Sequence, residues 1–370
     1  MARARRRVAK DLDALFERER EFHARLRRHH LPHGQIRSAE FGGGPGNAPT
    51  GYRQGSDGAL MTGLYLGYLS LAYSAARSRV ESAHVHEALD TMEMLTTAGG
   101  VAGRVCRQFY PGEPQECRHH AGKGPHAGLS FEMRTSRDQV TGVLWGLALC
   151  ASRFPDPSAR ARSLRLIEDV VMHHFDPDST TRRARWRIPA YGREPQRWMT
   201  FNMRLFCAGV GARLLAAPEL VAEYQRLLKQ VPTVARLARR AAPFHRHAEY
   251  FVNHLNLCRY WLLIRLESDT GVRGELSHLL ASRFRTVVDH GNTLFNFFVL
   301  DPAVEAARVD RRTLLDSGIQ SLRQLTEAKL WNHPRPLDQS VENVTCAYGW
   351  ALRSTTRLFK GLGRPMRRSK

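Results

Sequence analysis

Apolar residues recur at helical spacing through nearly the whole chain, and the resulting segments are of two kinds. Stretches such as TGLYLGYLSLAY (62–73) and HLNLCRYWLLI (254–264) are apolar nearly all round. Stretches such as SARARSLRLIEDVVMHHF (158–175) are apolar on one face only. A helix that is apolar on all sides must be buried, whereas an amphipathic helix covers it. The sequence therefore predicts an all-α chain built from hairpins of one inner and one outer helix.

The expected hairpins follow one another along the chain, and a single helix precedes them. No alternating pattern with hairpin-turn residues competes with the helical spacing, so few strands are expected. The predicted pairs are 57–76 with 81–97, 136–153 with 158–175, 200–216 with 218–228, 247–267 with 274–289, and 292–300 with 311–328, followed by 340–359.

Six inner and outer pairs predict a closed (α/α)6 toroid, a barrel of six helical hairpins. Helix 8–30 would be the outer partner of 340–359, and the Gly- and Pro-rich segment 31–56 would be a loop. A chain of 370 residues buries about 75% of the surface that its unfolded form exposes, so one core is sufficient for a single domain over residues 1–370. An open α-solenoid is the alternative; the length and the irregular loops favour closure.

The formal net charge of +21 raises the question of a polyanionic partner. Only six of the 56 basic residues are lysine, and the arginines are spread along the whole chain apart from short clusters at its two ends. No zinc finger, basic zipper or RNA-binding signature is present, so we expect no specific nucleic-acid partner. Affinity for an acidic carbohydrate is compatible with this charge, and a salt-sensitive polyanion-binding protein stays open as an alternative.

No apolar run reaches the roughly 20 residues of a membrane span, and the basic amino terminus has no apolar stretch behind it. These features predict a cytoplasmic protein without a membrane span. Cys106 and Cys117 lie in one expected loop and form a candidate disulfide. The CRHH stretch (117–120) is interpreted as a His-rich surface loop, because adjacent histidines point in different directions. No metal or cofactor is expected.

Two carboxylates stand where inner helices begin. Asp57 precedes one apolar run and Asp138 another, and a Thr-Gly pair follows each acid in a weak repeat of about 79 residues. An acid at a helix start is usually a cap, worth about 1 kcal/mol. In a ring, however, the inner helices run parallel, and their amino termini open on one face. Asp57 and Asp138 would therefore meet at that face.

Paired carboxylates are the groups that glycosidic or enol-ether hydrolysis requires, one to donate a proton and one to activate water. Asp57 stands beside apolar residues, which suits the proton donor, and Asp138 beside Arg137 suits the ionised partner. Other polar residues near the expected inner-helix starts are candidates for binding substrate: Arg137, Gln139, His254, His290, Asn292, Asn296 and Asp338. Trp186, Trp198 and Trp331 lie near loops and are candidate platforms for sugar rings.

Two alternatives to a hydrolase remain open. A polysaccharide lyase would use Tyr250 or His254 to abstract a proton while Asn253 and Arg259 neutralise a uronate carboxylate. A non-catalytic scaffold would bind a carbohydrate or a protein without cleaving it. The sequence favours the glycoside hydrolase, acting on an oligosaccharide that includes acidic sugars.

Several segments together resemble a known family. SDGALMTGLYLGYLSLAY, TTAGGVAGRVCR, TSRDQVTGVLWGLAL, HLNLCRYWLLIRLE and NTLFNFFVLDP are similar, in order, to segments of bacterial proteins of the six-hairpin glycosidase type. The resemblance covers roughly residues 50 to 300. It extends more distantly to unsaturated glucuronyl and rhamnogalacturonyl hydrolases. It implies an (α/α)6 barrel in which Asp residues at inner-helix starts protonate and hydrate an enol ether without a metal. Asp57 and Asp138 match such positions by context, whereas GSDGAL and SRDQVT stand in place of that family's aromatic-rich motifs.

Overall fold

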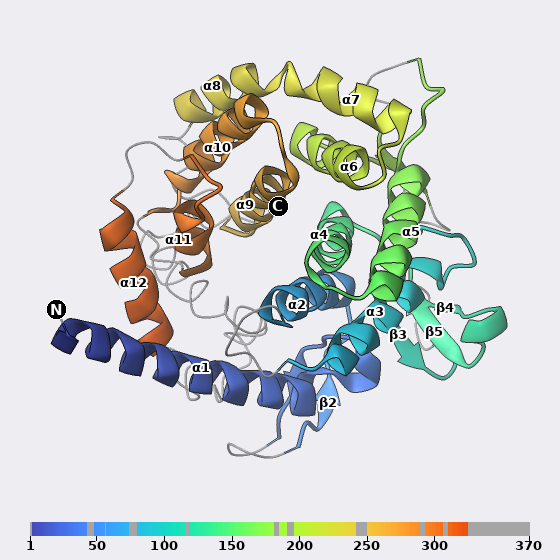
Figure 1. Cartoon of the computed structure of the whole chain (residues 1–370). Coiled ribbons are helices and arrows are strands. Elements are labelled where there is room, and N and C mark those ends of the chain that lie inside the picture. Colours follow the sequence, from blue (N-terminus) through green and yellow to red (C-terminus); the bar gives the residue numbers. More distant parts are fainter. Residues whose placement is uncertain are drawn as a thin grey trace, which may run out of the picture. The chain divides into compact units, whose positions relative to one another are not determined.

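The computed structural model describes residues 2–42, 48–55, 57–73, 80–114, 119–180, 185–190, 196–241, 250–288, 293–305 and 310–324. Within these ranges the chain is mostly helical, with twelve α-helices and seven short strands (Figure 1). The chain divides into two compact units. The first comprises Met1–Glu40 and Gly51–Lys229, and the second comprises Phe41–Thr50 and Gln230–Lys370. The single domain expected over residues 1–370 stays a prediction.

The first unit contains three consecutive helical hairpins, at the positions that the apolar spacing predicts. The first member of each hairpin packs against its successor along the chain. The bounds are α2 (Gly58–Tyr73) with α3 (Ser82–Thr97), α4 (Arg137–Arg153) with α5 (Pro157–His174), and α6 (Phe201–Leu214) with α7 (Pro218–Leu228). In Figure 1, α2, α4 and α6 form one layer, and α3, α5 and α7 cover it.

Helices α2 and α4 pack backbone to backbone and run parallel. A Cβ atom at Gly63 would collide with the Gly142 carbonyl, and one at Gly146 would collide with the Gly63 carbonyl. Further along, Gly67 lies against Trp145 and Leu149. Positions therefore advance together along both helices, as the repeat of about 79 residues predicts. The Thr-Gly pairs mark the place where only glycine permits this approach.

The amino ends of α4 and α6 also lie side by side, because the Thr141 hydroxyl donates to Met203 Sδ at 3.4 Å. Thr141 is in the second turn of α4 and Met203 in the first turn of α6. The expectation that the inner helices open on a common side is thus confirmed within the first unit. Local capping contributes as well: Ser136 Oγ accepts the Gln139 N–H at 3.4 Å, and Asp156 Oδ1 accepts the Ala159 N–H at 2.7 Å.

Three small antiparallel sheets interrupt the helical pattern, and the spacing did not predict them. The largest has the order β3 (Gln108–Pro111), β5 (Leu129–Glu132), β4 (His119–Ala121). The others pair β1 (Ala39–Glu40) with β2 (Gly51–Tyr52), and β6 (Arg187–Ile188) with β7 (Arg197–Trp198). These strands are only two to four residues long, which is too short to produce a readable period of two.

The largest sheet corrects the interpretation of the CRHH stretch as a surface loop. His119 is 6% exposed on β4, and its ring stacks on Tyr110 of β3 at 4.8 Å between centroids. Phe109 and Phe131 pair on the opposite face of the sheet, with both rings buried. Cys117 lies outside the described residues, and Cys106 is a buried free thiol.

Helix α1 (Ala2–His30) packs on the first hairpin. His23 Nε2 lies 2.9 Å from the Tyr65 hydroxyl of α2, and Tyr68 donates to Glu19. Burial, together with the nearby charges of His84 and Arg27, lowers the pKa of His23 to about 4. A short 3-10 turn (Pro32–Gly34) follows α1 and leads into β1 within the segment expected to be a loop.

The second unit also consists of helical hairpins. Helix α9 (Tyr250–Leu266) packs on α10 (Thr270–Phe284), and α11 (Thr293–Leu300) packs on α12 (Arg311–Gln324). Helix α8 (Val231–Ala241), which was not among the helices predicted from the sequence, packs on α10. The predicted helix 340–359 lies outside the described residues.

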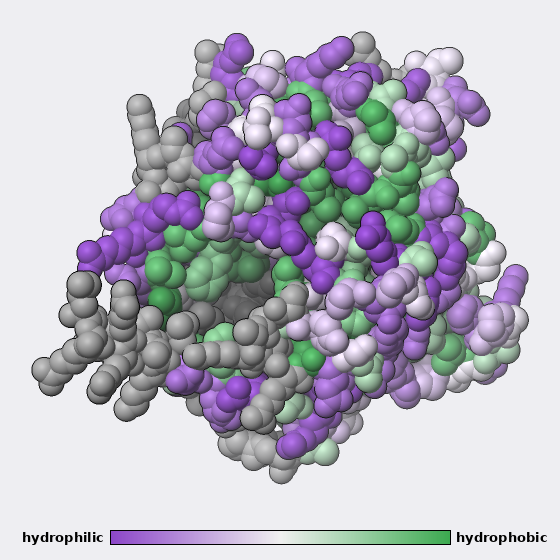
Figure 2. All heavy atoms as spheres, viewed as in Figure 1, coloured by the Kyte–Doolittle hydropathy of each residue, from purple (hydrophilic) through white to green (hydrophobic). Residues whose placement is uncertain are grey.

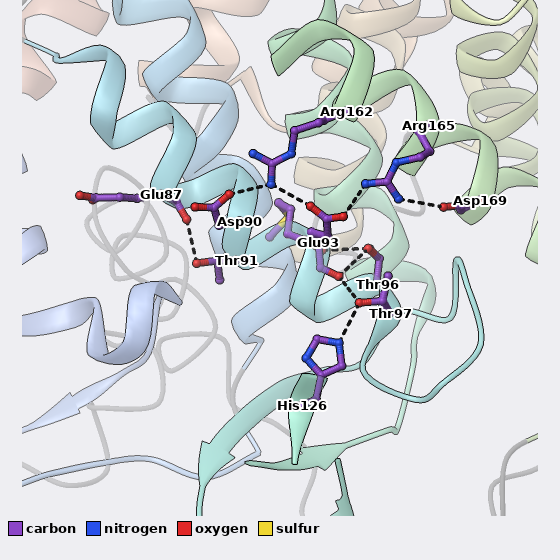
Figure 3. Close-up of polar contacts among 11 residues, drawn as sticks. Glu87, Asp90, Thr91, Glu93, Thr96, Thr97, His126, Arg162, Arg165 and Asp169 are labelled. Atoms are coloured by element: carbon purple, nitrogen blue, oxygen red, sulfur yellow. Dashed lines mark hydrogen bonds and ion pairs between the residues drawn. The ribbon is translucent and has the colours of Figure 1, made fainter. Parts of the chain in front are cut away.

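An ion-pair network joins the outer helices α3 and α5. Arg162 Nη2 donates to Asp90 Oδ1 at 2.6 Å and to Glu93 Oε2 at 2.7 Å, and Arg165 donates to the other oxygen of Glu93 (Figure 3). Burial raises the pKa of Glu93, but hydrogen bonds from Arg162 and Arg165 outweigh it and hold the pKa below its usual value. Figure 2 shows hydrophilic side chains in the region of the surface where α3 and α5 lie.

None of the helices in the described ranges combines the length and the apolar character that a membrane span requires. Four cysteines in these ranges are buried free thiols: Cys106, Cys150, Cys207 and Cys258.

Candidate functional site

Asp57 immediately precedes α2, and its carboxylate turns away from its own helix. Oδ1 accepts hydrogen bonds from Arg107 Nη1 at 2.5 Å and from Gln139 Nε2 at 2.7 Å. Asp57 takes part in the hydrogen-bond pattern of α2 through its backbone alone: its carbonyl accepts the Met61 N–H at 2.9 Å. The side chain remains 37% exposed. The capping role expected for Asp57 is therefore wrong for its side chain, which is an ion-paired group at the surface.

Gln139 replaces the missing cap. Its side chain is fully buried in the first turn of α4, where Oε1 accepts the Leu60 N–H of α2 at 3.0 Å while Nε2 donates to Asp57. The first turn of a helix leaves its N–H groups without partners inside the helix. Gln139 thus satisfies one of these donors in α2 and fixes the Asp57 carboxylate at the same time. Gln139 is fully buried, whereas a residue that binds substrate directly must reach solvent.

Arg107 connects the sheet to the helix ends. Its carbonyl accepts the Ala59 N–H of α2 at 2.9 Å, its N–H donates to the Glu132 carbonyl at 2.7 Å, and its Nε donates to the Arg134 carbonyl at 3.3 Å. The Arg107 side chain is 13% exposed. A guanidinium held this way stabilises the negative charge of Asp57. The suggestion that Asp57 sits in an apolar environment suited to a proton donor is therefore corrected.

A buried carboxylate belongs to the residue whose carbonyl accepts the Arg107 N–H, Glu132. Glu132 is fully buried on β5, and neither of its oxygens accepts a hydrogen bond from a described residue. Arg134 Nη2 lies 3.5 Å from Glu132 Oε1. Burial, with the charge of Glu132 as a smaller contribution, raises the pKa of the neighbouring Cys106 thiol. Cys106 is thus an inert buried thiol.

Asp138 and Arg137 stand in the first turn of α4. Arg137 is exposed and Asp138 is partly exposed, one residue before the buried Gln139. Because Gln139 contacts Asp57, the parallel α2 and α4 place Asp57 and Asp138 at the same pair of helix ends. The structure therefore brings four predicted site residues together: Asp57, Arg137, Asp138 and Gln139.

The other described candidates belong to the second unit. His254 is 2% exposed on α9, with its ring 6.0 Å from that of Phe295. Burial, with the charge of Arg259 as the second cause, lowers the pKa of His254 to about 4. Asn296 is 1% exposed on α11, where its Nδ2 donates to the Leu314 carbonyl of α12 at 3.2 Å. Packing accounts for the positions of His254 and Asn296. His290, Asn292 and Asp338 lie outside the described residues.

Arg107 is the site residue that sequence reasoning missed. It occupies the turn before β3, in a segment without helical spacing, and nothing local connects it with Asp57 fifty residues earlier. The available signal was the two-residue step of the buried Cys106 and Gln108, which leaves Arg107 between them on the other side of the extended chain. Among the described residues, no group of three or more His, Cys, Asp or Glu side chains is placed to hold a metal ion.

The site comprises the Asp57 carboxylate, held by Arg107 and Gln139, and the first turn of α4, which carries Arg137 and Asp138 next to Gln139 in the chain. No protein-family model matches the sequence, no curated protein is significantly similar to it, and no solved structure is significantly similar to its fold.

Proposed function

We propose that this protein is a carbohydrate-active enzyme of the glycoside hydrolase type, acting on an acidic oligosaccharide at the amino ends of α2 and α4. The observation that carries the proposal is the placement of Asp57 by Arg107 and Gln139 next to the helix turn that holds Asp138. Two carboxylates at one open end of parallel helices form the minimum set for hydrolysis of a glycosidic or enol-ether bond.

The two acids would divide the chemistry according to their surroundings. Asp57, which is ion-paired with Arg107, would activate water. Asp138 then supplies the proton, and a uronate carboxylate bound nearby would favour its protonated form by charge repulsion. This assignment reverses the roles suggested by the sequence. Arg137, exposed beside Asp138, is the candidate group for the substrate carboxylate.

We also propose that the hairpins close into the (α/α)6 toroid. Support comes from the three hairpins of the first unit, whose first members share an orientation, and from the hairpins α9–α10 and α11–α12 of the second unit. A crystal structure tests this directly. Six hairpins in a closed ring are expected, and an open arc would contradict the proposal.

The lyase alternative has less support than the hydrolase. His254 is buried, which leaves its imidazole neutral at pH 7 but removes it from contact with a polymer substrate. The non-catalytic scaffold would hold a ligand at the same helix ends without cleaving it.

Ultraviolet absorbance distinguishes the hydrolase, the lyase and the non-catalytic scaffold. The protein is incubated with unsaturated and with saturated uronate oligosaccharides while the absorbance of the conjugated double bond is followed. Loss of signal from the unsaturated set is the expected result. A gain of signal from the saturated set would show elimination and favour the lyase. A flat trace with both sets would contradict enol-ether hydration and elimination, and a flat trace without new reducing ends would contradict an enzyme acting on uronates and favour the scaffold.

A further inference from the structure

The segment that leads from α5 into α6 differs from the rest of the chain in its charge and its aromatic content. Residues 175–200, FDPDSTTRRARWRIPAYGREPQRWMT, carry six arginines against three acids, together with two tryptophans. Its described part forms β6 and β7, with Arg187 paired to Trp198 and Ile188 paired to Arg197. Arginine and tryptophan at this density suit recognition of anions and of flat ring faces.

The two tryptophans have opposite environments. Trp186 is fully buried, its Nε1 donates to Glu223 Oε1 at 3.0 Å, and its ring lies 4.7 Å from that of Phe175. Trp198 is 38% exposed on β7. Trp186 therefore anchors the hairpin to α7, and the hairpin presents the second indole at the surface. Exposing part of an indole forfeits hydrophobic stabilisation, which a ligand that covers the ring would restore.

The surroundings of the hairpin carry excess positive charge. Arg226 donates to both oxygens of Glu223, at 2.7 and 2.6 Å, while Arg185 lies 3.9 Å from the same carboxylate. Arg187, with a side chain 42% exposed, lies 3.7 Å from Asp176. Burial, followed by the charge of Arg226, lowers the pKa of Arg204. Cations crowded around few acids favour an added anion.

The hairpin also lies at the end of the fold that holds the candidate site. Trp198 is two residues before Thr200, the N-cap of α6. The first turn of α6 contacts α4 through Met203 and Thr141, and the first turn of α4 contacts α2 through Gln139 and Leu60. An oligosaccharide laid across the amino ends of these three helices would pass from the two acids toward Trp198.

We propose that the β6–β7 hairpin is a binding element for an anionic oligosaccharide, with Trp198 stacking on a sugar ring and its cross-strand partner Arg187, on the same face of the hairpin, contacting an acidic group. The identity of the ligand as a sugar rests on the proposed function. This binding element is separate from the acids Asp57 and Asp138. It would hold a part of the oligosaccharide that does not react.

Calorimetric titration with a saturated galacturonate tetramer tests the proposal. This ligand lacks the enol ether, so the titration reports binding whether or not the protein catalyses hydrolysis of unsaturated sugars. We expect Trp198→Ala to weaken binding about three- to tenfold and Trp198→Phe, which keeps a ring, to weaken it less. Arg187→Gln should weaken binding and reduce its dependence on salt.

Arg160→Gln is the matched charge control, since Arg160 is exposed on α5 away from the hairpin, and it should bind like the unmodified protein. A neutral glucose tetramer should bind more weakly than the acidic one. Equal binding by Trp198→Ala and the unmodified protein would overturn the proposal, as would no binding of the acidic tetramer. Tighter, Trp198-dependent binding of single-stranded RNA would overturn the sugar assignment. Loss of absorbance from unsaturated uronates together with normal binding by Trp198→Ala would retain the proposed reaction and reject the hairpin.

Discussion

Gly63 and Gly142, 79 residues apart, touch backbone to backbone where α2 crosses α4. No side chain fits between them. This contact sets the register in which Gln139 meets Leu60 and Asp57. Changes at these glycines therefore test the framework of the site without touching its polar groups.

We expect Gly142→Ala to destabilise the protein by about 1–3 kcal/mol, because the added methyl group would meet the backbone of Leu60, which cannot move without separating the helices. Thermal unfolding monitored by circular dichroism is the measurement. Gly274→Ala in α10 is the control, since a methyl group there lies at an ordinary distance of 3.6 Å from Glu305. The control should be neutral or slightly stabilising. Equal melting temperatures for the two variants would contradict the close contact.

Gln139 should be required for both stability and the placement of Asp57. Gln139→Leu keeps the volume but leaves the Leu60 N–H buried without an acceptor, which should cost about 1–3 kcal/mol. Gln139→Glu keeps an acceptor and adds a carboxylate beside Asp57, so its stability should improve as the pH falls and the pair takes up a proton. Urea unfolding at several pH values measures both effects. A Leu variant as stable as the original protein would contradict the bridging role.

Acid should destabilise the fold through its buried histidines. Burial lowers the pKa of His174 to about 3, although a contact with the Val170 carbonyl at 2.7 Å opposes the shift. The unfolded chain takes up a proton near pH 6.5, whereas folded His174 does not. Stability is therefore fully present above pH 6.5 and falls as the pH is lowered toward 3.

The melting temperature measured from pH 7.5 to pH 4 should fall steadily, and His174→Gln should fall less steeply than the unmodified protein. His278→Gln, at an exposed position on α10, is the control and should keep the original slope. The same slope in both variants would show that His174 does not contribute to acid sensitivity.

The network around Glu93 should make a small, salt-sensitive contribution. Glu93→Gln removes the ionic character of the contacts with Arg162 and Arg165, and about 1 kcal/mol of stability should be lost at low salt. Added salt screens such partly exposed pairs. The difference in stability between Glu93→Gln and the original protein should therefore shrink at about 0.5 M salt, where the Debye length is about 4 Å. Glu275→Gln, an exposed acid on α10, should show no such loss. A difference independent of salt would contradict an electrostatic origin.

Helical spacing located most helices and their order, since long apolar runs such as 58–73 must be buried on every side. The parallel direction of α2 and α4 was expected from the ring of inner helices, and the Thr-Gly repeat marks the place where the two helices touch. The sheet beside Arg107 was not predicted, because its strands are only three or four residues long and β3 pairs with β5, which is not the next strand in the chain. The direction of the Asp57 side chain depended on Arg107 beside that sheet, whereas the burial of Gln139 depends on its contact with Leu60 of α2.

The turnover of Asp138→Asn relative to Asp90→Asn is the measurement that tests the central claim most directly. Both variants remove one carboxylate from the first unit, but Asp90 belongs to the α3–α5 network and Asp138 to the helix ends that hold Asp57. With an unsaturated uronate oligosaccharide, we expect Asp138→Asn to lose at least about 100-fold in rate while its melting temperature is unchanged, and Asp90→Asn to remain active. Full activity in Asp138→Asn would contradict the assignment of catalysis to the amino ends of α2 and α4.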